Sequence, residues 1–130
     1  WDLAMEEYQT AANLAPEEAL FLAKQGAIYI KKRLFVEAEL LLQQALELDP
    51  DQVEALYNMG ILRGETQKFD EAIPYLEQAI ALQPNHGLAH YALAINYYNS
   101  GNREKATHHL QRAQELGVIV KPEILQRVGS

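Results

Sequence analysis

A fixed interval of 34 residues recurs along almost the whole chain and restricts the folds that are open to it. Self-similarity at such a period is typical of repeat architectures, in which each unit packs on its neighbours. A helical bundle without repeat order is the alternative, but it gives no reason for a constant interval. The series that keep the interval are Gly26, Gly60 and Ala94; Ala4, Ala38, Ala72 and Ala106; Ala11, Ala45, Ala79 and Ala113; Leu14, Leu48, Leu82 and Leu116; Pro16, Pro50 and Pro84; and Trp1, Phe35 and Phe69.

Each unit is predicted to contain two helices. Leu22, Gly26 and Tyr29 lie at positions i, i+4 and i+7, which form one face of a helix. A second segment repeats this helical spacing at Ala38, Leu42 and Ala45. We expect Gly26 to face Ala38 where the two helices cross, because helices approach closely only where side chains are small. A larger residue at Gly60 or Ala72 should therefore cost ~1–3 kcal/mol, whereas Glu77 is expected on an exposed face.

Two kinds of turn are predicted. The turns within the pairs are expected near Lys32–Arg33, Thr66–Gln67 and Ser100–Gly101. The turns between pairs are expected at Asp49–Asp51 and Gln83–Asn85, because each has a proline at its centre, and proline suits the start of a helix rather than its interior. Asp51 and Asn85 are the expected N-caps.

This pattern resembles the tetratricopeptide repeat family, whose unit of ~34 residues carries small, aromatic and proline residues at fixed places. Repeat one matches it through Leu22, Gly26, Tyr29, Phe35, Ala38, Leu42, Ala45 and Pro50. The resemblance implies an all-α, right-handed superhelical solenoid of antiparallel helix pairs. Departures are Arg63 for a tyrosine, His90 for a bulky apolar residue and Val118 for the closing proline.

The resemblance also implies a division of the chain. Residues 1–16 match the second helix of a truncated repeat, 19–52, 53–86 and 87–120 are three full repeats, and 121–130 are a C-terminal capping helix or tail. A short helix after residue 117 is expected to have Pro122 in its first turn and Ile124, Leu125 and Val128 on one face. The helix over 1–16 has no partner helix before it, so self-association through this N-terminal helix is a further expectation.

Composition excludes several function classes. The chain contains no cysteine, which excludes disulfides and thiolate metal sites. Its formal net charge is −7, whereas nucleic acid binding needs a basic face. No apolar run approaches the ~20 residues of a membrane-spanning helix, so no direct membrane insertion is expected. No targeting signal is visible, and the start at Trp1 is interpreted as that of an excised fragment.

No catalytic residue, metal or cofactor is predicted. His86 and His90 stand four residues apart, but a third metal ligand is missing and His90 fills a packing position. His108 and His109 are adjacent and therefore face different ways on a helix. The sequence contains no phosphate loop, nucleophile elbow or dinucleotide fingerprint.

The predicted function is binding of a protein or peptide in a concave groove. In the family, first-helix side chains line this groove. The matching residues are Leu20, Ala23, Lys24, Ala27, Ile30, Glu54, Tyr57, Asn58, Ile61, Leu88, Tyr91, Ile95 and Tyr98. Most are apolar or aromatic, and several could instead be half-buried between helices. The tyrosines would anchor the partner, and Asn58 would bind its backbone.

Two other functions remain open from the sequence. One is a substrate-docking arm of a larger enzyme, such as a glycosyltransferase, and the other is a self-assembling oligomeric scaffold. One family site can be excluded, the clamp that binds the acidic tail of heat-shock chaperones. Its lysine, arginine and asparagine places correspond to Ala23, Ala27, Asn58, Leu88 and Ala92, of which Asn58 alone matches.

Overall fold

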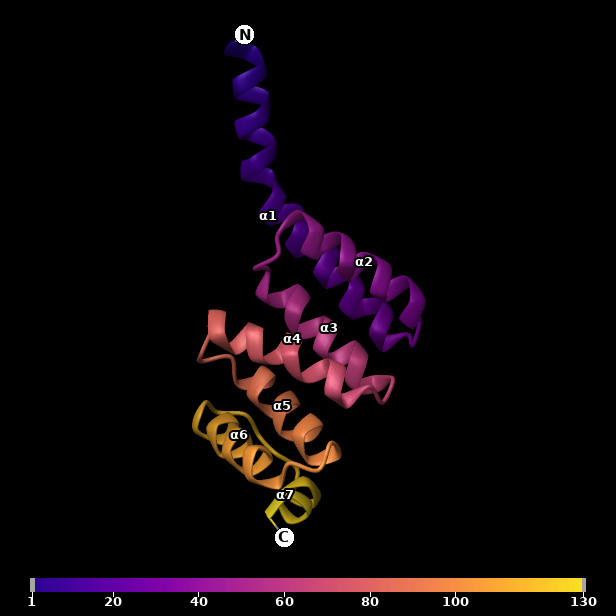
Figure 1. Cartoon of the computed structure of the whole chain (residues 1–130), viewed down its shortest axis with the longest axis vertical. Helices are drawn as coiled ribbons and strands as arrows, with labels where there is room; N and C mark the ends of the chain where they lie inside the picture. Colours follow the sequence, from indigo (N-terminus) through magenta and orange to yellow (C-terminus); the bar gives the residue numbers. More distant parts are fainter. Residues whose placement is uncertain (1, 130) are drawn as a thin grey trace. The chain divides into compact units, whose positions relative to one another are not determined.

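Seven α-helices and no strand are found in the part of the chain that the computed structural model describes, which is residues 2–129 for the backbone and 15–129 for side chains. Figure 1 shows them in chain order. They are α1 (Asp2–Lys31), α2 (Phe35–Leu48), α3 (Val53–Glu65), α4 (Phe69–Leu82), α5 (Gly87–Asn99), α6 (Arg103–Glu115) and α7 (Pro122–Gly129). The predicted all-α class is confirmed. The chain forms two compact units, residues 1–58 and 59–130, and the boundary falls within α3.

In the first unit, α1 packs against α2 at a glycine. A Cβ atom at Gly26 would lie 2.8 Å from Cγ of Leu42 and 3.6 Å from the carbonyl oxygen of Ala38. The predicted neighbour Ala38 is therefore present, but the closer contact is with Leu42, one helical turn further along α2. Gly26 is required because Leu42 already fills the space that a side chain would need.

The turns within the helix pairs lie where the sequence predicts them and share one geometry. Arg33 and Gln67 have φ values of 62°, and Gly101 has a φ of 93°. The residue after each donates its N–H to a carbonyl five positions earlier, as Leu34 does to Tyr29 at 2.9 Å. This is the Schellman ending of a helix, which normally favours glycine at the left-handed residue. Two of the three turns adopt it without glycine.

The predicted separate helix over residues 1–16 is not observed. Helix α1 continues through Pro16 to Lys31, and its N-terminal part extends beyond the end of α2 (Figure 1). A proline inside a helix removes one backbone donor and crowds the preceding turn, so a break was expected there. Its neighbours Ala15 and Glu17 are strong helix formers, which favour continuation. The assignment of residues 1–16 to a truncated repeat stays a prediction, and its side chains up to Leu14 lie outside the described residues.

In the second unit, the glycine crossing recurs between α3 and α4. A Cβ at Gly60 would lie 2.5 Å from Cγ of Leu76, which is fully buried. Helix α5 then packs on both α4 and α6, and α7 packs on α6. Ala72, Ala79 and Ala106 have no exposed surface. The small residues of the repeat are therefore the ones that let these helices approach.

The N-caps of α3 and α5 differ from the prediction. Gln52, rather than Asp51, accepts a hydrogen bond from the N–H of Glu54 at 3.2 Å. At α5 the cap is His86, whose Nδ1 accepts from the N–H of Ala89 at 3.0 Å. The N–H of Asp51 instead donates to Asp49 Oδ1 at 3.1 Å, and Oδ1 of Asn85 accepts from Arg112 at 3.2 Å. The helices begin one residue later than the proline spacing indicated.

The C-terminal segment forms the short helix that the sequence predicts, with Pro122 as its first residue. Val128 is 3% exposed and Ile124 is half-buried. Leu125 was expected on the same face but is 36% exposed. Helix α7 therefore covers apolar surface through Val128 and leaves part of its own face open.

Candidate partner-binding surface

The predicted groove residues of the first unit differ widely in accessibility. Lys24 is exposed, and Leu20, Ala27, Glu54 and Tyr57 are half-buried. The pKa of the Tyr57 hydroxyl is raised, first by burial and then by the nearby Glu54 carboxylate. These side chains retain surface that a partner could contact. The groove assignment remains a prediction.

Three predicted groove residues are parts of the core instead. Asn58 is 5% exposed, and its amide donates to the carbonyl of Ala23 at 3.4 Å. Ala23 has no exposed surface, and Ile30 is 8% exposed. The role expected for Asn58, binding a ligand backbone, stays a prediction, whereas in this structure its amide joins α3 to α1. Accessible surface depends on neighbouring helices that a one-helix pattern does not include.

In the second unit, α5 carries a row of accessible apolar side chains. Leu88 is 54% exposed, and Tyr91, Ile95 and Tyr98 are half-buried. Their spacing of three and four residues places them on one side of the helix. Ile61, on α3, is also half-buried. This row is the part of the predicted groove that keeps most apolar surface accessible.

A pocket of about 160 Å³ lies at the end of this row, between α5 and α7. It is lined by Ile95, Tyr98, Asn99, Ile124, Arg127 and Val128. Pockets for small-molecule ligands usually enclose roughly 300–1,000 Å³, so this one suits a single side chain better than a whole ligand. The guanidinium of Arg103 lies 5.8 Å from the centre of the Tyr98 ring and helps to fix its position.

Four of the six lining residues were missed by sequence reasoning. Ile95 and Tyr98 were predicted, whereas Asn99, Ile124, Arg127 and Val128 were not assigned to any binding site. Ile124 was interpreted as a capping residue that covers the array. The only sequence signal was the apolar periodicity of the last helix, which does not say where that helix packs.

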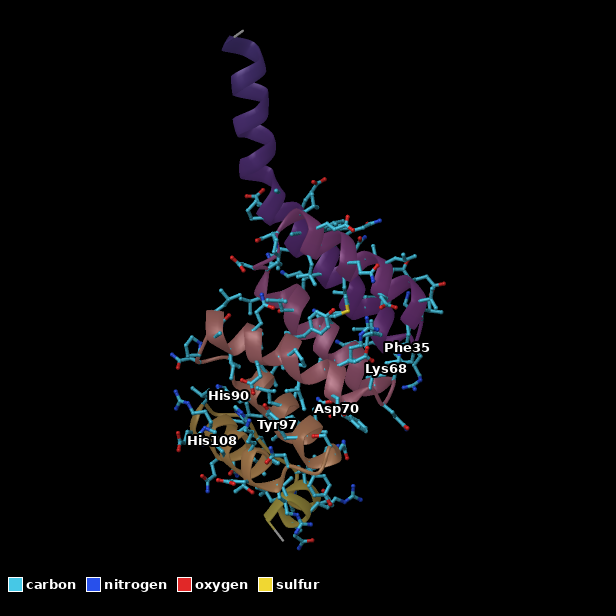
Figure 2. All side chains as sticks on the ribbon, viewed as in Figure 1. Phe35, Lys68, Asp70, His90, Tyr97 and His108 are labelled. Atoms are coloured by element: carbon cyan, nitrogen blue, oxygen red, sulfur yellow. The ribbon has the colours of Figure 1, made fainter. Side chains whose placement is uncertain are left out.

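A polar cluster joins α4, α5 and α6, and its members are Glu77, His90, Tyr97 and His109. Nε2 of His90 donates to the carbonyl of Pro84 at 2.9 Å, because a carbonyl can only accept. His90 Nδ1 lies within hydrogen-bond distance of His109 Nδ1, which is 3.0 Å away. The hydroxyl of Tyr97 donates to Glu77 Oε1 at 2.7 Å. Figure 2 shows His90 and Tyr97 within the second unit.

Glu77 was predicted on an exposed face, but it is half-buried beside this cluster. Its Oε1 also lies 3.6 Å from His109 Nε2. The Tyr97 pKa is raised to about 12 by burial, by the hydrogen bond to Glu77 and by its charge. The His109 pKa is lowered, mainly by burial, with smaller lowering from His90, His108 and Lys105 against a raising effect of Glu77. Burial in this cluster therefore favours the neutral forms of Tyr97 and His109.

Among the residues that the structure describes, no group of three or more histidine, cysteine or carboxylate side chains is placed to hold a metal ion. His86 is used as an N-cap, and His90 is bonded at both nitrogens. Within the described part of the chain, no helix is both long and apolar enough to cross a membrane.

Comparison with known families agrees with the repeat. Two models described as tetratricopeptide repeat match residues 41–73 and 65–117, which together cover more than half of the chain. The chain belongs to the tetratricopeptide repeat family. None of the curated proteins matches it significantly.

Solved structures of tetratricopeptide repeat proteins share this fold. MamA from AMB-1 is 28% identical with a TM-score of 0.68, over 85% of this chain and 61% of that one. MamA from MSR-1 is 29% identical with a TM-score of 0.67, over 88% and 66%. The first tetratricopeptide domain of Spaghetti (RPAP3), bound to the HSP90 peptide SRMEEVD, is 22% identical with a TM-score of 0.78, over 88% and 95%. This chain therefore spans less than two thirds of the MamA AMB-1 chain, and the family and fold identify it as a protein-interaction scaffold.

Proposed function

We propose that the chain binds an apolar segment of a partner protein on α5 and in the pocket between α5 and α7. The observation that carries the proposal is the row Leu88, Tyr91, Ile95 and Tyr98, which runs along one side of α5 and ends in the pocket. A helix surface that faces water is normally polar. An accessible apolar row beside a pocket of side-chain size is typical of a surface that accepts an anchoring residue.

The chemistry of the pocket specifies the anchor. Ile95, Ile124 and Val128 provide an apolar wall, and the ring of Tyr98 provides a flat one. Asn99 and Arg127 add polar groups to the lining. The pocket therefore suits an aliphatic or small aromatic side chain whose backbone carbonyl or neighbouring acidic group lies near Asn99 and Arg127. Burial would supply most of the affinity, so added salt should weaken binding only modestly.

The same fold holds a chaperone peptide in the RPAP3 structure. The proposed mode for this chain differs from a charged clamp, because Ala23, Ala27, Leu88 and Ala92 stand at the clamp places and the amide of Asn58 is bonded to Ala23. An acidic chaperone tail would find no lysine or arginine at those positions. An apolar segment is the better match to this surface.

The test begins with identification of a partner by pull-down with the 130-residue chain and mass spectrometry. The partner is then titrated calorimetrically against Tyr91→Ala, Tyr98→Ala and Ile95→Ser. Ile119→Ser is the matched control, since Ile119 is 95% exposed in the same unit and lies outside the pocket. We expect each pocket or row variant to weaken binding by about tenfold or more, and the control to bind as the parent does.

Circular dichroism checks that each variant remains folded. If all three variants stay folded and bind as tightly as the parent, α5 is not the binding surface. Tyr57→Ala then distinguishes the first unit, since its half-buried ring belongs to the predicted groove residues of that unit. An enzymatic docking arm would be supported instead if the captured partner were a covalently modified substrate.

A further inference from the structure

One side of α1 exposes two large apolar side chains seven residues apart. Phe21 is 62% exposed and Ile28 is 53% exposed. Residues at this spacing lie two turns apart on the same side of a helix, with the half-buried Gln25 between them, and this side is here named the Phe21–Ile28 face. Large apolar side chains exposed on one side of a helix are candidates for an interaction surface.

The repeat shows what this face is built to contact. The equivalent positions one repeat later are Ala55 and Leu62, which are 0% and 1% exposed. Two repeats later they are Ala89 and Asn96, which are 0% and 4% exposed. In both later repeats this side of the first helix is buried. Only the first repeat leaves it open.

Within the second unit, the elements that cover this side are visible. Helix α4, the second helix of the preceding repeat, packs on α5. The side chain of Asn96 also lies against Gly64 at the end of α3, where an added Cβ would be 3.0 Å from Asn96 Oδ1. The covering group is thus a preceding helix pair, with a second-type helix as one of its members.

The chain contains one further sequence with the second-helix pattern. Ala4 and Ala11 hold the places of Ala72 and Ala79, the fully buried residues of α4. They belong to the segment before Pro16, which here is the N-terminal part of α1. Because α1 is one helix that rises about 1.5 Å per residue, this segment points away along the helix axis and cannot fold back onto Phe21 in the same chain.

The residues around Pro16 explain why this segment stays extended. The corresponding turns read Asp49–Pro50–Asp51 and Gln83–Pro84–Asn85, and the first contains a hydrogen bond from the Asp51 N–H to Asp49 Oδ1. Around Pro16 the polar turn formers are replaced by Ala15 and Glu17. Both are strong helix formers, whereas Asp and Asn favour turns.

We propose that the Phe21–Ile28 face binds residues 2–16 of a second copy of this chain, and that the exchange is reciprocal. Each copy would provide the second-type helix that the other lacks, which is an exchange of identical elements about a two-fold axis. The contact inside the dimer would be the one that α4 makes with α5 within a single chain. The extended α1 is then the open form that such an exchange needs.

The first experiment measures molar mass by light scattering over a concentration series of the 130-residue chain. We expect a dimer whose dissociation constant rises at least about 100-fold in the double variant Phe21→Ser/Ile28→Ser, because burial of two large apolar side chains is lost. Val36→Ser is the matched control, since Val36 is 72% exposed on α2 and lies outside the face. It should leave the dimer unchanged.

The second experiment rebuilds the turn. The variant Ala15→Asp/Glu17→Asp restores the Asp–Pro–Asp sequence of residues 49–51, so the N-terminal helix can close on its own chain. We expect this variant to be monomeric and at least as resistant to thermal unfolding as the parent. A parent that is monomeric at every concentration would overturn the proposal. If Phe21→Ser/Ile28→Ser were then less stable than the parent, the N-terminal helix would close on its own chain. If the two proteins were equally stable, the face would bind a different partner. A dimer that survives the double variant would also overturn it.

Discussion

Replacement of Gly60 by alanine tests the packing of the helix pairs most directly. The new Cβ would lie 2.5 Å from Cγ and 2.6 Å from Cδ2 of Leu76, whereas carbon atoms in contact are about 3.5–4.0 Å apart. Each contact is therefore about 1 Å too short. Leu76 has no exposed surface, so its side chain cannot move aside into solvent.

The expected magnitude combines two opposing effects. Overpacking of a filled core typically costs ~1–3 kcal/mol, and an overlap of this size belongs in the upper part of that range. Alanine in place of glycine inside a helix returns ~1 kcal/mol through the lower backbone entropy of the unfolded chain. Gly60→Ala should therefore lower the free energy of unfolding by ~1–2 kcal/mol. Without the overlap, the same change would stabilise the protein.

The assay is urea denaturation followed by circular dichroism, with a double-mutant cycle. Gly129→Ala is the control, because no atom lies within 4 Å of the Cβ it would add. In a Leu76→Ala background the overlap is absent, so Gly60→Ala should become neutral or stabilising, with a coupling energy of ~1 kcal/mol or more. Equal effects of Gly60→Ala in both backgrounds, or a more stable single variant, would refute the reasoning.

Two further predictions concern the buried polar cluster. The His109 pKa is lowered below 6.5, so its contribution to stability is present above pH 6.5 and is lost as the pH falls through the folded-state pKa. In denaturation series, His109→Gln should therefore lose less stability than the parent between neutral pH and about pH 5. The same loss of stability in both proteins would contradict this. Glu77→Leu removes the acceptor of the Tyr97 hydroxyl and should cost ~1 kcal/mol, more than the exposed control Gln78→Leu at less than ~0.5 kcal/mol. In the same variant, ultraviolet titration should show the Tyr97 pKa moving down from about 12, and an unchanged value would show that burial alone sets it.

The helix pairs and their turns could be predicted because they depend on residues close together in the sequence. Gly26 and Gly60 mark the crossings, and the left-handed residues Arg33, Gln67 and Gly101 keep the same interval. The same small residue or turn is needed at the equivalent position of every repeat. The 34-residue interval therefore shows the same packing requirement several times in one sequence.

Details at the helix starts were predicted less well. Asp51 and Asn85 have the right chemistry for N-caps, yet Gln52 and His86 fill that role. The choice depends on one residue of register, and Asp49 already uses the N–H of Asp51. Similar competition decides Pro16, where helix-forming neighbours keep α1 continuous although the proline spacing predicts a turn.

The sequence by itself determined the fold class, the helix pairs and the family, because a 34-residue periodicity records which side chains must be small. Only the tertiary structure decided which side chains remain accessible. Asn58 has a groove position in the sequence pattern, but its amide donates to the carbonyl of Ala23. Glu77 has a surface position in the pattern, but its carboxylate accepts from the Tyr97 hydroxyl. The pocket of Ile95 and Ile124 exists because α7 packs beside α5. Burial and hydrogen bonding depend on atoms from other helices, and no spacing along one helix contains that information.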